Sequence, residues 1–152
     1  MGGTGERKFV FVDKPAREVA AKLADVIKGH TTPTLTYISS LLMPGTNSYM
    51  EFGWIWEMPT PNPHILEHVH EYDEYLVHIG SDPADPEDLG AEIEFHIDGQ
   101  TLLISKTSAL YIPGGVKHGP VIWRRVDRPH IQMAIFPAQG DMRKTGVGGY
   151  SV

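Results

Sequence analysis

Short runs of β-branched and aromatic residues dominate the chain from residue 35 onward. Turn-forming stretches separate them at 44–48 (PGTNS), 60–64 (TPNPH) and 81–90 (SDPADPEDLG). Asp98-Gly99 between two such runs is a strong hairpin signal. The runs span 35–43, 49–58, 74–80, 91–97, 101–105, 109–113, 120–126 and 130–136. About eight or nine short strands without interleaved helices predict an all-β barrel or sandwich.

A helical period precedes these strands. Between Asp13, which can cap a helix, and Gly29, which can end one, Pro15 suits the first turn. Four apolar residues in this stretch form one stripe at helical spacing: Val19, Leu23, Val26 and Ile27. We therefore expect one N-terminal helix packed on the β-structure, and a short edge strand at 9–12 (FVFV) before it.

The length of 152 residues suits a single domain over 1–152 with a real core. The Gly-rich residues 1–8 are expected to form a flexible tail. We assign the N-terminal strand, helix and strand to 9–48, the barrel core to 49–136 and a C-terminal extension to 137–152.

The composition indicates the class of protein, its compartment and the residue types that can bind a metal. The hydrophobic content is 41% and the charged content is 21%, which is ordinary for a globular protein. No apolar run approaches the length of a membrane span, and the N-terminus lacks the apolar segment of a signal peptide. We expect a cytoplasmic protein without a membrane partner. Because the chain has no cysteine, any metal must be held by histidine and carboxylate.

The net charge of −6 is unevenly spread. Residues 29–105 contain 13 acidic residues and neither Lys nor Arg. A negative middle repels a phosphate backbone, so we expect no nucleic-acid partner. Most of these acids are interpreted as a solvated face.

The candidate metal ligands lie in two segments, 67–74 (EHVHEYDE) and 111–119 (YIPGGVKHG). His68 and His70 lie two residues apart, so on an extended chain they project from the same face. A tight bend at 71–73 lets Glu74 fold back beside them at the start of the next strand, and His118 follows a Pro-Gly-Gly turn. Three imidazoles and one carboxylate suit a divalent transition metal and leave coordination positions open.

These residues resemble the two motifs of the cupin family. The first motif, G-x5-H-x-H-x3,4-E-x6-G, is met by His68, His70 and Glu74, although Gly80 follows after five residues rather than six. The second, G-x5-P-x-G-x2-H-x3-N, is met by Pro113, Gly115 and His118. Three positions depart from the motifs: Asn62 and Thr107 replace the leading glycines, and Ile122 replaces the final Asn. We expect Asn62 to adopt the left-handed turn that a glycine would supply.

The resemblance covers roughly residues 50–136 and implies a double-stranded β-helix, a jelly-roll barrel, with the metal inside its mouth. It implies one metal held by His68, His70, Glu74 and His118, with Fe(II) or Mn(II) favoured over Ni(II), Zn(II) or Cu(II). Such proteins include dioxygenases, isomerases, lyases and non-catalytic binders, so the fold does not fix the function. The prediction is a metal-dependent enzyme acting on a small oxygen-chelating molecule, a dioxygenase first, with an isomerase or lyase, or a non-catalytic metal- or metabolite-binding protein, as alternatives.

Other residues are candidates for the pocket. By strand parity His78 faces the same way as Glu74 and is the candidate acid or base, against a structural histidine inside the barrel. Arg124 shares parity with His118 and is a candidate carboxylate anchor, against a solvated rim arginine. For His130 and Gln132, opposite apolar neighbours on their strand, solvent or an interface is favoured over the pocket.

The remaining expectations concern aromatic residues, two further histidines and assembly. His64 and His96 are interpreted as loop and surface residues. Most of the large aromatic residues are assigned to the core, while one or two can wall a small-molecule pocket, Tyr111 being the candidate substrate contact: Phe52, Trp54, Trp56, Tyr111 and Trp123. The resemblance to small cupins, which pair through edge strands and N-terminal segments, favours a homodimer with FVFV as the pairing edge.

Overall fold

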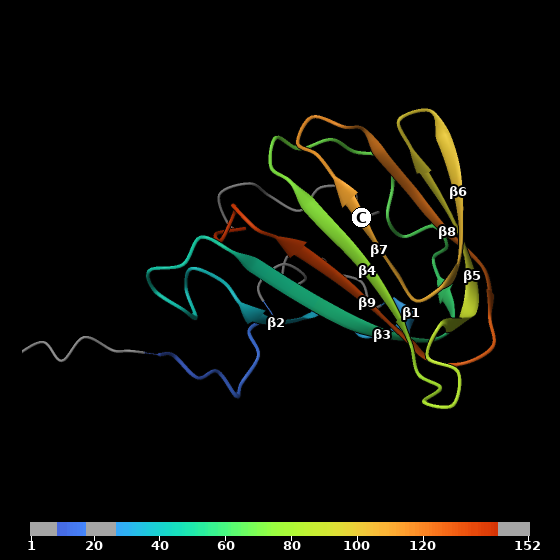
Figure 1. Ribbon diagram of the computed structural model, residues 1–152, viewed down its shortest axis with the longest axis horizontal. Coiled ribbons are helices and arrows are strands. Elements are labelled where there is room, and N and C mark those ends of the chain that lie inside the picture. Colours follow the sequence, from blue (N-terminus) through green and yellow to red (C-terminus); the bar gives the residue numbers. More distant parts are fainter. Residues whose placement is uncertain (1–8, 18–26, 143–152) are drawn as a thin grey trace, which may run out of the picture.

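The computed structural model describes residues 9–17 and 27–142. Within these ranges the chain folds into nine strands and no helix (Figure 1). The strands are β1 (Lys28–His30), β2 (Leu35–Ile38), β3 (Tyr49–Thr60), β4 (Glu74–Gly80), β5 (Asp88–Ile97), β6 (Gln100–Lys106), β7 (Ser108–Ile112), β8 (His118–Val126) and β9 (His130–Phe136). The predicted all-β architecture is confirmed.

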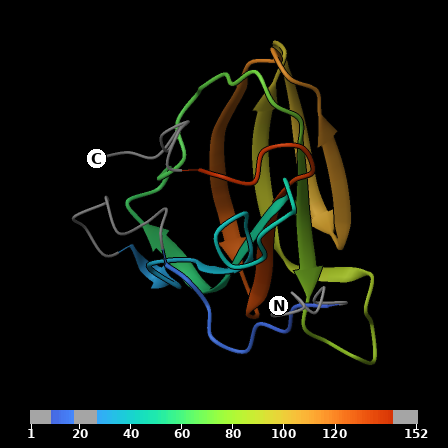
Figure 2. The same ribbon diagram turned by 90° about the vertical axis from the view of Figure 1, so that its left-hand side faces the viewer.

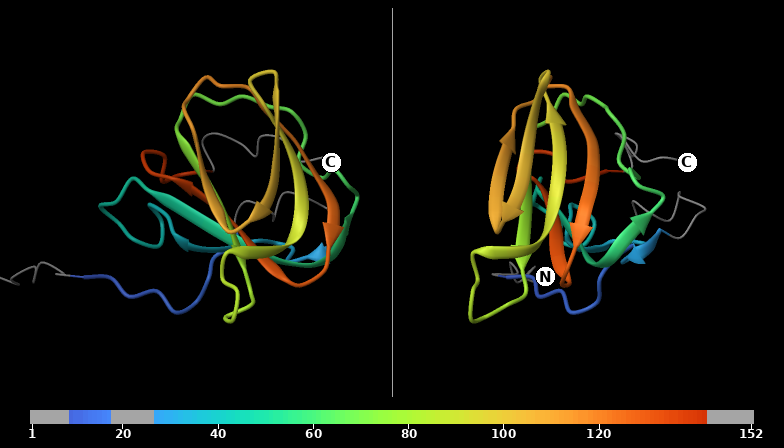
Figure 3. Two further views of the ribbon diagram at one scale, coloured as in Figure 1. Left: turned by 45° about the vertical axis from the view of Figure 1, so that its right-hand side comes forward. Right: turned by 90° about the vertical axis from the view of Figure 1, so that its right-hand side faces the viewer.

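The strands form two antiparallel sheets. The larger has the order β1-β3-β9-β4-β7, with β2 also paired to β3, and the smaller has the order β6-β5-β8. The sheets face each other and enclose the core between them (Figures 2 and 3). Buried side chains from both sheets fill this core, among them Leu76, Ile93, Phe95, Val121 and Trp123. Two facing antiparallel sheets are the jelly-roll arrangement.

Cross-strand register arranges the inward side chains of the larger sheet in rows. Glu51 of β3 pairs with Ala134 of β9, which pairs with Leu76 of β4. One row further, Gly53 pairs with Gln132, which pairs with His78. Directly paired residues share one face of a sheet, so both rows point to the interior.

The opposite, outer face of the same sheet is apolar. Trp54 pairs with Ile131, and Tyr75 pairs with both Ile135 and Tyr111. The exposed fraction is 39% for Trp54, 40% for Tyr75 and 50% for Tyr111. The register adds further apolar residues to this outer face: Met50, Val77, Ile79 and Met133. The exposed side of the smaller sheet is charged instead. Arg124 forms an ion pair with Glu94 there, and Arg125 forms one with Glu92.

The predicted N-terminal helix is wrong at both of its ends. Lys14, next to Asp13, lies in a bend, Ala16 forms a β-bridge with Thr36, and residues 28–30 form β1. Residues 18–26, the middle of the expected helix, lie outside the described residues. Gly29 has a φ of 78°, and a Cβ atom there would lie 2.9 Å from the Glu57 carbonyl oxygen. Glycine at this position thus serves the close approach of β1 to β3 and not a helix end.

The expected edge strand at 9–12 is also wrong. Residues 9–12 form no strand, and Phe9 and Phe11 are 81% and 79% exposed. The segment 1–8 lies outside the described residues. Over the part of the chain that the structure describes, no helix is long and apolar enough to cross a membrane.

Candidate metal centre

Backbone pairing brings the two motifs together. His68 and His118 form a β-bridge in which each amide N–H donates to the other residue's carbonyl, at 2.8 and 3.0 Å. The Gly115 amide donates to the His70 carbonyl at 2.8 Å, and the Gly114 amide donates to the Asp73 carboxylate at 2.8 Å. The Pro-Gly-Gly turn is therefore docked against the chain around His70. His68 and His118, 50 positions apart in the sequence, thus become part of one site.

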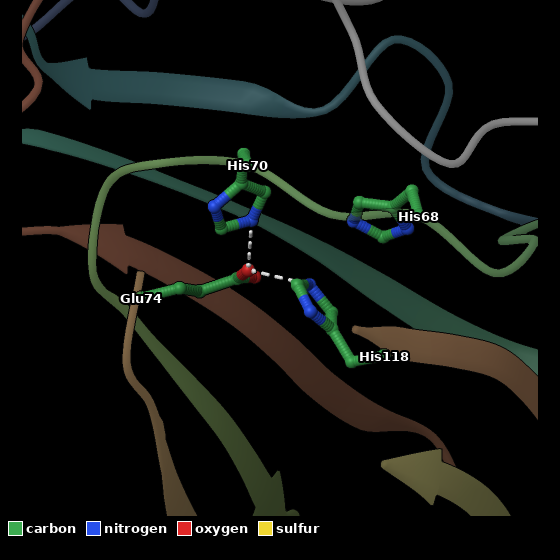
Figure 4. Close-up of side chains that lie close together, drawn as sticks. All are labelled: His68, His70, Glu74 and His118. Carbon is green, nitrogen blue, oxygen red and sulfur yellow. Dashed lines mark hydrogen bonds and ion pairs between the residues drawn. The ribbon is translucent and has the colours of Figure 1, made fainter. Parts of the chain in front are cut away.

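The four predicted ligands converge (Figure 4). One ligand atom from each of His68, His70, Glu74 and His118 lies within 4.8 Å of the others. Glu74 Oε2 is 3.0 Å from His70 Nε2 and 3.3 Å from His118 Nε2. Glu74 and His118 are buried, while His68 and His70 are partly exposed. These four residues can hold a metal ion.

Each imidazole is oriented by a backbone carbonyl. His68 Nδ1 lies 2.8 Å from the Leu66 oxygen, His70 Nδ1 lies 2.8 Å from the Tyr72 oxygen, and His118 Nδ1 lies 2.8 Å from the Val116 oxygen. A carbonyl oxygen only accepts, so all three Nδ1 atoms must carry the proton. In the neutral rings Nε2 is then the lone-pair atom, which is the arrangement that metal-binding histidines use.

The charges of the site are coupled. Burial raises the pKa of the Glu74 carboxyl, but hydrogen bonds with His118 and His70 outweigh it, so this pKa lies below its ordinary value. For His118, burial lowers the pKa, and the Glu74 carboxylate together with the Val116 carbonyl raises it to a value above the ordinary one. Burial keeps the pKa of His68 below its ordinary value. Three lone pairs and a carboxylate facing one point require a cation or protons between them, and the donor set fits a divalent transition metal.

A cavity opens beside these ligands. It holds about 640 Å³ of empty space, its open mouth included. His68, His70 and Glu74 form one side, and Phe52, Ile65, Tyr72, Leu76, Ala134, Phe136 and Met142 form the mainly apolar walls. The remaining wall is polar and consists of His30, Thr34, Glu51 and Gln132.

The structure places His78 behind this cavity. Its ring is 1% exposed, does not line the cavity and has Nε2 3.0 Å from Nε2 of Gln132, which does line it. Burial, together with the neighbouring His130, lowers the pKa of His78 to about 3. A catalytic role for His78 stays a prediction, and its contact with the cavity runs through Gln132.

The two predicted substrate contacts, Arg124 and Tyr111, are not brought to the cavity. Arg124 is paired with Glu94 on the exposed side of the smaller sheet. The reason is a register shift: β8 pairs His118 with Ile97 but Val121 with Phe95, around Gly119 with its φ of 93°. This irregularity reverses the strand parity on which the prediction for Arg124 relied. Tyr111 lies on the outer face of the larger sheet and packs against Tyr75.

Three polar residues expected outside are instead buried. His64 and His130 are 0% exposed and Gln132 is 8% exposed, so the expectation of solvent for these residues is wrong. His64 stacks on Trp123, whose indole N–H donates to His130 Nε2 at 3.1 Å. Burial lowers the pKa of His64 to about 3 and of His130 to about 4. His96, by contrast, keeps a partly exposed side chain beside Glu94.

Two aromatic residues assigned to the core and one motif residue also need correction. Trp54 and Trp56 are 39% and 50% exposed, whereas Trp123 is buried as expected. Asn62 does not adopt a left-handed conformation, because Asp98 is the only non-glycine residue with a positive φ in the described ranges. Its side-chain amide instead pairs with both the N–H and the carbonyl of Trp123, at 3.0 and 2.8 Å.

The sequence reasoning missed the polar wall. Glu51 lies in the run YMEFGWIWEM, where it is an acid at the same strand parity as the buried Tyr49 and Ile55. That parity was the available signal, since an ionised side chain on a buried face needs a purpose. His30 at the end of the short strand β1 and Thr34 in the irregular segment before β2 carried no comparable signal.

Comparisons with known proteins address only the fold. No protein-family model matches the sequence, and no curated protein has a matching sequence. Among solved structures, the chain is similar to an RmlC-like cupin from Shewanella frigidimarina, with 13% identity, a TM-score of 0.49 and coverage of 87% of this chain and 91% of that one. It is also similar to KdgF from a Halomonas species (18% identity, TM-score 0.46, 78% and 89% covered) and to the polyketide cyclase RemF from Streptomyces resistomycificus (13%, 0.47, 86% and 72%).

The fold and the site together define the class. Two facing antiparallel sheets carry both predicted motifs, and the motif residues meet at one cavity. The protein has an all-β cupin fold with a four-residue site that can hold a metal ion.

Proposed function

We propose that this protein is a metal-dependent enzyme acting on a small oxygen-chelating molecule, with a dioxygenase as the first candidate reaction. The supporting observation is the convergence of three imidazoles, each fixed by a backbone carbonyl, with Glu74 at the side of a small cavity. An isomerase or lyase would use the same site, because either needs a metal beside bound substrate oxygens.

The residues of the chain have defined tasks in this proposal. His68, His70, Glu74 and His118 would hold the metal, and Fe(II) or Mn(II) fits this donor set best, with Ni(II), Zn(II) or Cu(II) as alternatives. When bound, the metal supplies Lewis-acid or O2-activating chemistry. The carbonyls of Leu66, Tyr72 and Val116 keep each proton on Nδ1 and each Nε2 directed at the site. The apolar walls restrict water around the substrate.

Metal content and turnover test the proposal. Protein purified from its own host would be assayed for bound metal, and the Fe, Mn, Ni and Zn forms would be screened with catechols, hydroxy-ketones, keto acids and sugar acids. We expect consumption of one substrate class by one metal form, with O2 uptake for a dioxygenase and none for an isomerase or lyase. Saturable binding without any consumption would replace the enzyme by the alternative, a non-catalytic metal- or metabolite-binding protein.

We also propose that the protein forms a homodimer, through the outer face of the larger sheet. Trp54, Tyr75 and Tyr111 expose apolar surface there, and four strands at about 4.8 Å spacing and about 23 Å length project to roughly 450 Å². The largest apolar patch of a monomer has about this size and is often functional. Two copies that each carry a net charge of −6 repel one another, so an uncharged face is the surface on which they can meet.

Sedimentation equilibrium at micromolar concentration tests the dimer. Trp54→Glu should convert a dimer to a monomer, whereas Leu103→Glu, at a residue 69% exposed on the smaller sheet, should not. A monomeric wild-type protein would contradict the dimer. Dissociation caused by changing Phe9 and Phe11 to serine, but not by Trp54→Glu, would instead favour pairing through residues 9–12.

A further inference from the structure

A second buried carboxylate lies in the cavity wall. Glu51 is 6% exposed, lies on β3 and lines the same cavity as His68, His70 and Glu74. Its neighbours along the row are apolar, Ala134 and then Leu76. An ionised group in such surroundings is costly unless other groups hold it.

A chain of hydroxyl groups holds this carboxylate. Tyr49 Oη donates to Glu51 Oε2 at 3.0 Å, and Thr34 Oγ1 donates to the same oxygen at 2.9 Å. Thr36 Oγ1 lies 2.8 Å from Tyr49 Oη and must donate to it, because the tyrosine proton is directed at Glu51. Tyr49 and Thr36 are both 0% exposed. Three hydroxyls from β2, β3 and the segment before β2 thus fix the position of one carboxylate.

The spacing of strands and residues in the larger sheet sets the distance between this carboxylate and the metal centre. Glu51 is two strands away from β4, and its row reaches β4 at Leu76, two residues after Glu74. With about 4.8 Å between strands and about 3.3 Å per residue, the two glutamate Cα atoms are separated by about 12 Å. Both side chains point to the interior, and Ala134 between their strands contributes only a methyl group. The span suits a small molecule that contacts both ends.

We propose that Glu51 is a substrate-positioning residue that accepts a hydrogen bond from a hydroxyl or amino group at the far end of the substrate. This inference rests on the proposed function, in which oxygens at the near end of the substrate bind the metal. The substrate class is a small molecule with chelating oxygens at one end and a hydrogen-bond donor several bonds away. An anionic far end is disfavoured, because it would face the Glu51 carboxylate at close range.

A matched pair of probes tests this specificity on the Ni(II)-loaded full-length protein. The probes are 5-hydroxy-2-oxopentanoate and 2-oxopentanoate, which share a keto-acid chelating end and differ in the distal hydroxyl. Titration calorimetry should show tighter binding of the hydroxylated probe by about tenfold or more, the range expected for a hydrogen bond to a charged acceptor. This wild-type comparison requires no variant to fold.

Two variants locate the effect. Glu51→Gln should reduce the preference for the hydroxylated probe to about threefold or less, since the acceptor loses its charge. Glu57→Gln, a matched change at an exposed glutamate of the same strand, should leave the preference intact. Both variants should bind as much Ni(II) as the wild type by elemental analysis.

The outcomes separate the two proposals. Equal affinity for the two probes, no binding of either probe by nickel-loaded protein, or a preference that survives Glu51→Gln would overturn the role of Glu51 while leaving the metal site standing. Failure of the wild-type protein to bind Ni(II) would overturn the proposed function and this inference with it.

Discussion

Seven of the eight histidines form two groups that share one fold but have different surroundings. The cavity group consists of His68, His70 and His118, and its rings direct Nε2 toward the site of Glu74. The inner group consists of His30, His64, His78 and His130, which are all buried, and His30 also lines the cavity. Its rings contact aromatic residues, one another and the amide of Gln132.

The two groups differ in burial, since His68 and His70 are partly exposed, and above all in their neighbours. A carboxylate beside the cavity group counteracts the cost of charge, so the pKa of the buried His118 is above its ordinary value. For His64, His78 and His130, desolvation by burial lowers the pKa values to about 3, 3 and 4. One group is therefore arranged to face positive charge, and the other is neutral internal structure.

Lowering the pH should reduce the free energy of unfolding through the inner group, and this is the largest expected effect on stability. A histidine whose pKa is lower in the folded state than in the unfolded state destabilises the fold as pH drops below about 6.5, because the unfolded chain takes up the proton. From pH 7 to pH 5.5, His64, His78 and His130 should each remove about 1.2 kcal/mol, roughly 4 kcal/mol together. Urea unfolding at the two pH values measures this loss.

Two variants sharpen the acid test. His78→Gln should shrink the loss by about a third, as expected when one of three equivalent groups is removed. His96→Gln should leave it unchanged, because that ring is partly exposed beside Glu94. A free energy of unfolding that stays constant from pH 7 to pH 5.5 would contradict the assignment of the inner group as neutral and buried.

Removing His78 should separate stability from metal binding. His78→Ala leaves a cavity and takes away the partner of Gln132, so unfolding should become easier by about 2–4 kcal/mol. Bound metal per chain should not change. If His78 also assists proton transfer through Gln132, turnover should decrease by about a hundredfold. Unchanged turnover would exclude His78 from the mechanism, and loss of metal would contradict the division between the groups.

Trp123→Phe should give a smaller effect. It removes the indole N–H that donates to His130 Nε2 and leaves a buried acceptor unpaired, at a cost of about 1–3 kcal/mol. Trp56→Phe is the matched control, because Trp56 is 50% exposed. Equal costs for the two changes, measured by urea unfolding at pH 7, would show that the Trp123–His130 bond does not stabilise the inner group.

The sequence was sufficient for the cavity group because chemistry and spacing agreed. Two motifs named four residues, and the strand pattern predicted an all-β fold with most strand positions correct. The predicted helix at 13–29 was the exception, since helical spacing of apolar residues does not reveal that β3 pairs with residues 28–30. Tertiary pairing here overrides local periodicity.

The predictions for His130 and Gln132 were wrong for a different reason. On β9 the alternation was correctly recognised, but its apolar residues Ile131, Met133 and Ile135 were assigned to the interior. The outer face of the larger sheet is itself apolar, so hydrophobicity alone could not distinguish the two faces. His130 and Gln132 therefore appeared to face solvent. The irregularity after His118 similarly reversed parity for Arg124, and a single bulge leaves no clear mark in a sequence.

The central claim is that only the cavity group binds metal, and the metal content of two alanine variants tests it most directly. His118→Ala and His78→Ala each remove one buried imidazole, one from each group. Elemental analysis after equal loading with Ni(II) or Fe(II) should show that His118→Ala loses most of the bound metal, because three ligands hold it less tightly. His78→Ala should match the wild type at one metal per chain. Full occupancy in His118→Ala, or equal loss in both variants, would contradict the account.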